Sequence, residues 1–412
     1  MTSSFNALKL AQAQIADLDL QLLRRKLRVT QSPCDTDAIV ENRTLKAFCS
    51  NDYLGLANHP DLIKALAQGG EKYGVGSGAS HLISGHSLAH ELLEKKLASF
   101  QEKQIPKARA LFFSTGYLAN LAAITGLAKL AQRGDVSLYS ARLNHASLID
   151  GVRLASAQTD AVVHLFDHTN LTSLTDTLKK DTKSLKLIVT DGVFSMDGDL
   201  APAKELVRIA EQYDALLVLD DAHGFGALGK QGHGLLEQEG IHSDRVIYIG
   251  TLGKAAGVSG AFICAQASFI DWLIQKGRPY IYSTATPPAI AHTLLKSLEI
   301  IESHEGAKRR AQLCELIKIW QDEMIFSNWK KVSSCTAIQP VILGSNANAL
   351  RAAKLLDEAG YWIPAIRPPT VPLGSARLRI TFSANHSLDD LRNLIATLKK
   401  IEQEVSVKEA HG

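Results

Sequence analysis

The first feature of the sequence that suggests chemistry is a lysine set among small residues. Lys254 follows the apolar run Val246–Gly250 and lies within Thr251-Leu-Gly-Lys-Ala-Ala-Gly257. No bulky side chain shields it locally, and no adjacent acid pairs with it in the sequence. A lysine in such a setting can be a buried amine that loses its proton, as Schiff-base chemistry requires. An isolated lysine is more often a surface residue, so the rest of the chain must decide.

Polar side chains follow several other apolar stretches that have the character of β-strands. In a parallel sheet the carboxyl ends of the strands share one edge, and ligands bind beyond that edge. One such residue alone is usually structural, as a helix cap or a satisfied core histidine, but their joint occurrence favours a single site. The stretches concerned are Ser114-Thr-Gly116-Tyr117, Asn144-His145, Asp191 with Ser195, Asp220-Asp-Ala-His223, and Thr251 with Lys254.

The elements that must position these residues alternate along the chain. Short, β-branched, fully apolar strands separated by amphipathic helices indicate an α/β fold with a mainly parallel sheet and helices on both faces. The predicted strands are Ala110–Phe113, Val136–Tyr139, Val162–Phe166, Leu185–Thr190, Ala215–Leu219 and Val246–Gly250. The predicted helices between them are Gly116–Gln132, Ala146–Leu154, Leu171–Lys180 and Pro202–Tyr213.

The two ends of the chain have a different pattern. Residues 5–28, with apolar positions such as Phe5, Ile15 and Leu22, predict an amphipathic helix that packs elsewhere on the molecule or on a partner subunit. Beyond about residue 300, longer helices and isolated strands predict a smaller α+β domain. We therefore expect an N-terminal helical arm over residues 1–50, a large domain over 51–300 and a small C-terminal domain over 301–412.

Composition excludes several classes of protein. The 412 residues are 46% hydrophobic and 21% charged, and the formal net charge of +3 gives no basis for nucleic-acid binding. The five cysteines are scattered and never spaced C-x-x-C, which argues against a disulfide framework and against a metal site. Neither a signal peptide nor an apolar run of roughly 18 residues is visible, so we expect a cytoplasmic protein without a membrane partner.

One glycine motif suggests a different cofactor. Gly224-Phe-Gly226-Ala-Leu-Gly229 follows a predicted strand and matches the G-x-G-x-x-G pattern of dinucleotide-binding proteins. That pattern should open a helix, whereas the following Lys230-Gln-Gly232-His-Gly234 is a poor helix former. The acid expected at the end of the next strand, Asp244, instead precedes it. An NAD(P)-dependent oxidoreductase is therefore a remote alternative.

The remaining residues fit a pyridoxal phosphate (PLP) site. This cofactor needs a lysine for its aldehyde, a carboxylate that keeps its ring nitrogen protonated, and an aromatic or imidazole face on its ring. Lys254, Asp220 and the two strand-end histidines can meet these needs. The phosphate needs an anion cradle, which the amides and dipole of a helix N-terminus supply, and Gly116-Tyr117 lie at such a point.

From about Arg24 to about Leu398 the sequence resembles the α-oxoamine synthases, which have the type I PLP fold. The resemblance implies a mainly parallel seven-stranded sheet with helices on both faces, a smaller α+β C-terminal domain, and a homodimer with shared active sites. The matching stretches are Ser50–Leu56, Leu82–Ser87 with His90, Leu143–Ser147, Gly192–Gly198, Asp220–Gly224, Thr251–Lys254, Tyr282–Thr284 and Ile366–Pro372.

The resemblance also implies a role for each matching residue. Lys254 would bind the cofactor and remove the α-proton, Asp220 would pair with the pyridinium nitrogen, and His145 would stack on the ring. Arg379 would clamp the amino-acid carboxylate, although Arg377 shares its strand face and the pattern alone does not choose between them. The other implied contacts are His223 and Ser195 to the ring oxygen, Thr251 and the amides of Gly116 and Tyr117 to the phosphate, Ser283 and Thr284 to the neighbouring subunit's phosphate, and Arg24 and Thr370 to the acyl substrate.

The implied activity is the decarboxylative condensation of L-alanine with a pimeloyl thioester, with release of carbon dioxide and the thiol carrier. Members that use glycine, such as 2-amino-3-ketobutyrate CoA ligase and 5-aminolevulinate synthase, share the cofactor residues, and Ala365–Pro372 favours the alanine-using members. The chain departs from the family pattern at Asp191, where glutamate is usual, at His81, where arginine is usual, and at Ala255-Ala256, where a bulkier residue is common.

Overall fold

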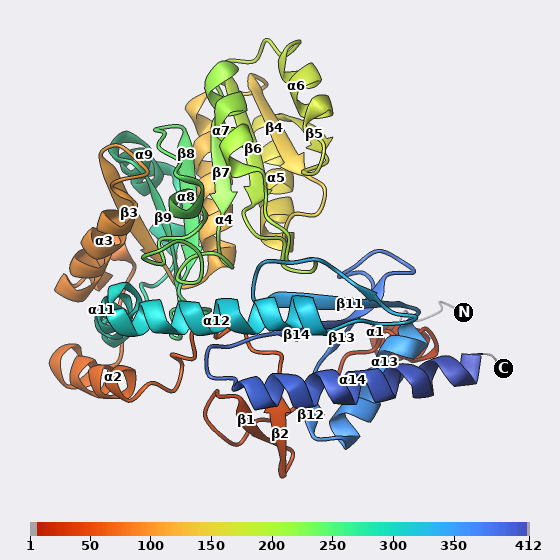
Figure 1. Cartoon of the computed structure of the whole chain (residues 1–412). Helices are drawn as coiled ribbons and strands as arrows, with labels where there is room; N and C mark the ends of the chain where they lie inside the picture. Colours follow the sequence, from red (N-terminus) through yellow and green to blue (C-terminus); the bar gives the residue numbers. More distant parts are fainter. Residues whose placement is uncertain (1–5, 410–412) are drawn as a thin grey trace. The chain divides into compact units, whose positions relative to one another are not determined.

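The central feature of the computed structural model, which describes residues 6–409, is a seven-stranded sheet (Figure 1). Its strands lie in the order β3-β9-β8-β7-β6-β4-β5, and those from β8 to β5 are parallel to one another. The predicted α/β class and mainly parallel sheet are thus confirmed. The parallel strands are β4 (Val136–Ala141), β5 (Val162–Phe166), β6 (Leu185–Asp191), β7 (Leu216–Asp220) and β8 (Val246–Thr251).

The seventh strand was not apparent from the sequence pattern. β9 (Ala261–Gln266) lies between β8 and β3 (Ala108–Phe113) and is antiparallel to both. An antiparallel strand needs no helical crossover, so residues 252–260 join β8 to β9 through turns and the helix–strand alternation stops there. This connection carries Lys254.

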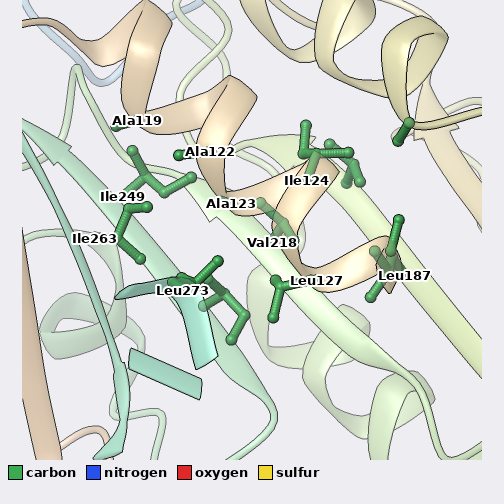
Figure 2. Close-up of a cluster of buried hydrophobic side chains, with 14 of the residues drawn as sticks. Ala119, Ala122, Ala123, Ile124, Leu127, Leu187, Val218, Ile249, Ile263 and Leu273 are labelled. Atoms are coloured by element: carbon green, nitrogen blue, oxygen red, sulfur yellow. The ribbon is translucent and has the colours of Figure 1, made fainter. Parts of the chain in front are cut away.

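Helices cover both faces of this sheet (Figure 1). α7 (Ala203–Gln212) lies on one face, and α4 (Gly116–Leu127) and α5 (Ala146–Thr159) lie on the other. Figure 2 shows the alanines of α4 at positions 119, 122 and 123 packed towards strand residues such as Ile249 and Ile263. Small side chains allow the helix to approach the sheet closely. The N-terminus of α4 is thereby fixed at the carboxyl edge of the parallel strands.

Other helices of the large unit surround this core. The sequence analysis did not predict α2 (Pro60–Tyr73) or α9 (Ala267–Lys276). The segment around Gly224–Gly229 forms turns and opens no helix, as expected, and α8 begins only at Leu235. The remaining helices are α3 (Leu88–Gln101), α6 (Thr172–Leu178), α8 (Leu235–Glu239), α10 (Arg278–Tyr282) and α11 (Pro288–Glu302), with two short turns, the π-helix η1 (His81–Gly85) and the 3₁₀ helix η2 (Ala128–Leu130).

The chain divides into two units. The large unit is Asn51–Cys314, and the small unit combines Met1–Ser50 with Glu315–Gly412. The second boundary lies within α12 (His304–Glu323). The N-terminal stretch therefore shares a unit with the C-terminal stretch, whereas the sequence pattern separates it as an arm. A parallel pairing of β2 (Arg43–Ala47) with β12 (Tyr361–Trp362) is one link between the two stretches.

The small unit contains two sheets and three further helices. The first helix, α1 (Ala7–Leu20), ends earlier than the predicted 5–28 helix because Leu22 takes a left-handed φ of 57°. The predicted apolar residue Phe5 lies outside the described residues.

Among the helices that the structure describes, none combines the length and apolarity of a membrane span. The other elements are β1 (Asp37–Val40), β10 (Lys330–Lys331), β11 (Ile338–Gly344), β13 (Ala365–Ile366), β14 (Ala376–Thr381), α1 (Ala7–Leu20), α13 (Asn346–Glu358) and α14 (Leu388–Glu409).

Candidate active site

Lys254 lies at the end of a hydrogen-bonded chain of four side chains. Its Nζ is 2.9 Å from Nε2 of His223, and Nδ1 of His223 is 2.6 Å from the hydroxyl oxygen of Tyr53. The Tyr53 hydroxyl in turn donates to Oδ1 of Asn51 at 3.1 Å. The two ring nitrogens of His223 thus bridge the Tyr53 hydroxyl and the Lys254 amine, and the tautomer decides which of them carries the hydrogen. The chain therefore orients the lysine amine.

A second chain connects Asp220 with His145. The Nδ2 atom of Asn120 lies 2.6 Å from Oδ2 of Asp220 and 2.8 Å from Oγ of Ser147. Ser147 Oγ is 2.7 Å from Nδ1 of His145, the residue that caps α5. The amide of Ala222 donates to the other Asp220 oxygen at 3.0 Å. A buried carboxylate with two donors has a fixed direction, as a partner for a ring nitrogen requires.

Asp191 positions the backbone of His145. Its Oδ2 accepts the His145 amide hydrogen at 2.6 Å, and its own amide donates to Asn144 at 3.0 Å. Burial and the nearby charge of Asp220 raise the pKa of Asp191 well above its usual range. Burial also lowers the pKa of His145, with the Asp220 charge opposing and the Lys254 charge adding to this effect. Asp191, Asp220, His145 and Lys254 thus share one electrostatic environment.

The predicted phosphate contacts lie around the start of α4. Thr115 caps this helix by accepting from the Leu118 amide, and the amides of Gly116 and Tyr117 belong to the first turn, where helix geometry provides no internal partner. A Cβ added at Gly116 would lie 3.9 Å from Oγ1 of Thr251, so the end of β8 lies beside this turn. The Tyr117 hydroxyl donates to Asp150, away from the cradle of amides.

Ser195 and the pair Ser283–Thr284 have their own local supports. Ser195 is partly buried in the turn that follows Phe194, where the Gly198 amide donates back to the Phe194 carbonyl at 2.8 Å. Thr284 forms an antiparallel bridge with Ser80. Ser283 and Thr284 line a small cavity together with Ser114 and Leu118 of the same chain.

Of the four predicted substrate residues, Arg24, Thr370 and Arg379 lie in the small unit, and His145, which caps α5, lies in the large unit. Arg379 is buried in β14, as is Arg377, whose Nε donates to the Ser375 carbonyl at 3.1 Å. Arg24 pairs with Asp19 at 2.7 Å on an exposed surface. The adjacent residue contacts Thr370 instead, since Nη2 of Arg25 donates to the Thr370 hydroxyl at 3.2 Å.

Arg25 also lines a cavity in the small unit. The cavity has a volume of about 260 Å³, and three cationic side chains are among the residues that line it. Burial and the Arg25 charge lower the pKa of Arg367. The lining residues are Leu23, Arg25, Lys26, Ala365, Ile366, Arg367, Pro368 and Thr370.

The residues of the large unit fit PLP. The Asn120 Oδ1 atom is buried without a hydrogen-bond partner among the described residues, although the same amide holds Asp220. A buried polar atom without a partner from the protein is typical of a ligand site. Lys254 would hold the aldehyde, Asp220 the ring nitrogen, His145 the ring face, and the first turn of α4 the phosphate.

The sequence analysis missed two residues that hold this group together. Asn120 follows Gly116 by four positions and therefore lies on the same face of α4, so the helical period was an available signal. Tyr53 was part of a matching stretch but received no role. Its contact with His223 spans 170 positions, and no local pattern indicates such a contact.

Known proteins share both the sequence and the fold of this chain. The family model described as aminotransferase class I and II matches residues 44–398. An 8-amino-7-oxononanoate synthase from Janthinobacterium sp. (strain Marseille) is 52% identical over 393 residues, which cover 95% of this chain and 98% of that protein. A solved serine palmitoyltransferase with a PLP internal aldimine has a TM-score of 0.87 at 26% identity, covering 98% of this chain and 100% of that chain. An 8-amino-7-oxononanoate synthase structure from Francisella tularensis has a TM-score of 0.73 at 31% identity, covering 89% and 99%.

Proposed function

Because the chain belongs to the 8-amino-7-oxononanoate synthases, PLP-dependent acyltransferases of biotin biosynthesis within the class I and II aminotransferase family, we propose its reaction. The enzyme condenses L-alanine with a pimeloyl thioester, carried by coenzyme A or acyl-carrier protein. The products are 8-amino-7-oxononanoate, carbon dioxide and the free thiol carrier. The observation that carries the proposal is the group of Lys254, His223 and Asp220 at one edge of the sheet, in a chain 52% identical to a named synthase.

The residues of the large unit would hold the cofactor and manage protons. When bound, PLP supplies an electron sink for the α-carbon of the amino acid. Asp220, held by Asn120 and the Ala222 amide, would keep the ring nitrogen protonated. Lys254 would take the α-proton at Nζ, and Nε2 of His223, 2.9 Å from that atom, would orient the amine for the transfer.

The cationic cavity of the small unit supports an anionic acyl substrate. Arg25, Lys26 and Arg367 line it, and the Thr370 hydroxyl is held by Arg25. A pimeloyl chain ends in a carboxylate, and both carriers bear a phosphate, so either anion matches these side chains. We assign acyl-substrate binding to this cavity, with Arg25 rather than Arg24 as the residue that contacts Thr370, and assign the amino-acid carboxylate to Arg379.

A substrate matrix tests the reaction. Purified enzyme is assayed with L-alanine or glycine, each paired with a pimeloyl or an acetyl thioester, and with Lys254→Ala as the inactive control. We expect the alanine–pimeloyl pair to have the highest kcat/KM. Since alanine and glycine differ by one methyl group, its advantage over glycine should be about 10–200-fold. Preference for glycine with the acetyl thioester would reassign the enzyme to the glycine-using branch.

We further propose a cytoplasmic homodimer in which Ser283 and Thr284 reach the phosphate of the partner subunit. Hybrid dimers of Lys254→Ala with Ser283→Ala/Thr284→Val test this arrangement. If the sites are shared, one site of the hybrid carries both defects and the other is intact, so about half of the wild-type activity returns. If the hybrid stays inactive, Ser283 and Thr284 serve their own chain, where they line a cavity with Ser114.

A further inference from the structure

Three histidines gather in the large unit, and one of them, His81, lines the small cavity that Ser283 and Thr284 also line. His81 opens η1, His86 follows it, and His90 lies in the first turn of α3. One ring nitrogen of each lies within 4.8 Å of the others. His81 and His90 are buried and His86 is half-buried. Such a convergence of imidazoles is a potential site for a transition-metal ion.

The outer nitrogens of two rings are already bonded, and this determines where the inner lone pairs point. Nε2 of His90 lies 2.7 Å from the Thr286 carbonyl oxygen, so it carries a hydrogen and donates it. Nε2 of His86 faces the Glu91 carboxylate at 3.4 Å and does the same. Both Nδ1 atoms are therefore acceptors. Metal-binding histidines commonly have this arrangement, with the second N–H donated to a carbonyl or a carboxylate.

His81 supplies the third nitrogen. Its ring stacks on Tyr280 with a centroid distance of 4.7 Å and an interplanar angle of 9°. Nδ1 of His81 lies 2.9 Å from Nδ1 of His86. Because the latter is an acceptor, His81 donates the hydrogen between them.

We propose that His81, His86 and His90 bind one Zn²⁺ or similar divalent transition-metal ion through their three Nδ1 atoms, at a site that includes none of the predicted PLP residues. The metal replaces the hydrogen between His81 and His86, and that hydrogen moves to Nε2 of His81. The ion also replaces both contacts of His90 Nδ1 with Ser87, to its amide at 3.0 Å and to its hydroxyl at 3.1 Å. Water fills the fourth position.

The distances suit such an ion after a small adjustment. Zn–N bonds of about 2.0–2.1 Å in a tetrahedral site place the ligand nitrogens about 3.3 Å apart. The His81–His86 pair at 2.9 Å needs to open by a few tenths of an ångström, and the nitrogen of His90, which lies within 4.8 Å of the other two, needs to close to the same separation. Because the His90 ring also holds the Thr286 carbonyl, the ion would fasten η1 and α3 to the segment that carries Ser283 and Thr284.

The test measures zinc on tag-free, PLP-loaded enzyme. Chelator-treated protein is equilibrated with Zn²⁺, and the bound metal and its affinity are determined by mass spectrometry and calorimetry. His81→Phe keeps the ring that stacks on Tyr280 but removes the nitrogen, and His86→Gln removes a second ligand. The exposed His304 at the start of α12 supplies a matched control, His304→Gln.

We expect one zinc per chain in the wild type and in His304→Gln. Both ligand variants should bind at least about 100-fold more weakly, and Glu91→Gln, which removes the partner of His86, about 10–100-fold more weakly. Bound-PLP absorbance confirms that each variant is folded. The proposal is overturned if the wild type binds no zinc, or if His86→Gln with its PLP bound keeps the wild-type affinity. The readout does not involve turnover, so it stands apart from the proposed reaction.

Discussion

At the scale of single residues, the polar side chains at strand ends were predictable from the sequence. The side chains that hold them in place by hydrogen bonds were not. Asp220 ends β7, His145 caps α5, and Lys254 follows β8, all positions that an apolar run followed by a polar residue reveals. Asn120 lies in a mostly apolar helix, and only its helical spacing from Gly116 indicates that it faces the same site. Tyr53 meets His223 only through the tertiary fold. Sequence pattern therefore identifies groups that face a ligand more readily than groups that hold those groups in place.

Asn120→Ala should weaken cofactor binding and slow turnover. The change removes the amide that lies 2.6 Å from Asp220 and 2.8 Å from Ser147. A hydrogen bond to a buried charged group contributes about 1.5–3 kcal/mol, which corresponds to about 10–100-fold in PLP affinity. Titration of the apoenzyme with PLP, followed by absorbance, measures the loss.

Thr125→Val is the matched control for Asn120→Ala. Thr125 lies on the same helix, and its hydroxyl donates only to the Leu121 carbonyl among the bonds described for it. Its PLP affinity should stay within about twofold of the wild type, because a helical hydroxyl bond of this kind contributes little. Equal affinities for wild type and Asn120→Ala would show that Asp220 needs no such support.

At the scale of elements, the sequence predicted helices and strands where alternation was regular and failed where it stopped. The strands β4 to β8 agree with their predicted ranges to within one or two residues. β9 escaped prediction because it follows β8 through turns, next to the glycine-rich lysine segment. That segment is held internally: the Leu252 amide donates to the Gly260 carbonyl at 2.8 Å, and the Gly257 amide donates to the Lys254 carbonyl at 2.8 Å.

Gly257→Ala should destabilise the enzyme and disturb Lys254. Gly257 has a φ of 69°, and an added Cβ would lie 2.6 Å from the Ala57 amide nitrogen. The left-handed conformation costs about 1–2 kcal/mol, and forced overpacking costs about 1–3 kcal/mol more. Thermal unfolding and the visible absorbance of bound PLP are the measurements.

Gly134→Ala separates the two contributions. Gly134 also has a positive φ, 81°, but its added Cβ would meet nothing within 4 Å. Only the conformational cost of about 1–2 kcal/mol should appear, and the PLP absorbance should not change. If Gly257→Ala is no worse than Gly134→Ala, then the close approach to Ala57 has no energetic consequence.

At the scale of the whole molecule, fold class followed from pattern but the division of the chain did not. Composition and alternation indicate an α/β protein without saying that residues 1–50 associate with residues 315–412. That association depends on pairings such as Tyr361 with Lys46, which are remote in sequence. A sequence pattern divides the chain into consecutive segments, whereas the fold joins two segments that are far apart in the sequence into one unit.

The buried Asp221 should make stability depend on pH. Burial raises the pKa of Asp221 to about 7, while an unfolded aspartate has a pKa of about 3.9. Between these values the folded protein keeps a proton that the unfolded chain has lost. Stability from this group therefore falls as pH rises, by up to about 1.4 kcal/mol per pH unit, and levels off above pH 7.

Asp221→Asn tests that dependence, because it retains acceptors for the Leu235 amide and the Tyr248 hydroxyl without a titratable group. Its melting temperature relative to wild type should rise from pH 5 to pH 7. Asp176→Asn, at an exposed carboxylate, should follow the wild-type profile. Parallel curves for wild type and Asp221→Asn would mean that Asp221 is ionised throughout this range.

The antiparallel β8–β9 connection also determines how the lysine can move. Both stems of the connection are sheet strands, and the Ala256 carbonyl between them accepts a hydrogen bond from Ser297 at 2.6 Å. The backbone at Lys254 is thus held in place on both sides. On the proposed role of Lys254, its amine would withdraw from an incoming amino-acid substrate by rotation about its own four-carbon stem. Such rotation is fast and leaves the backbone in place, so the amine would stay within reach to accept and return a proton in every cycle.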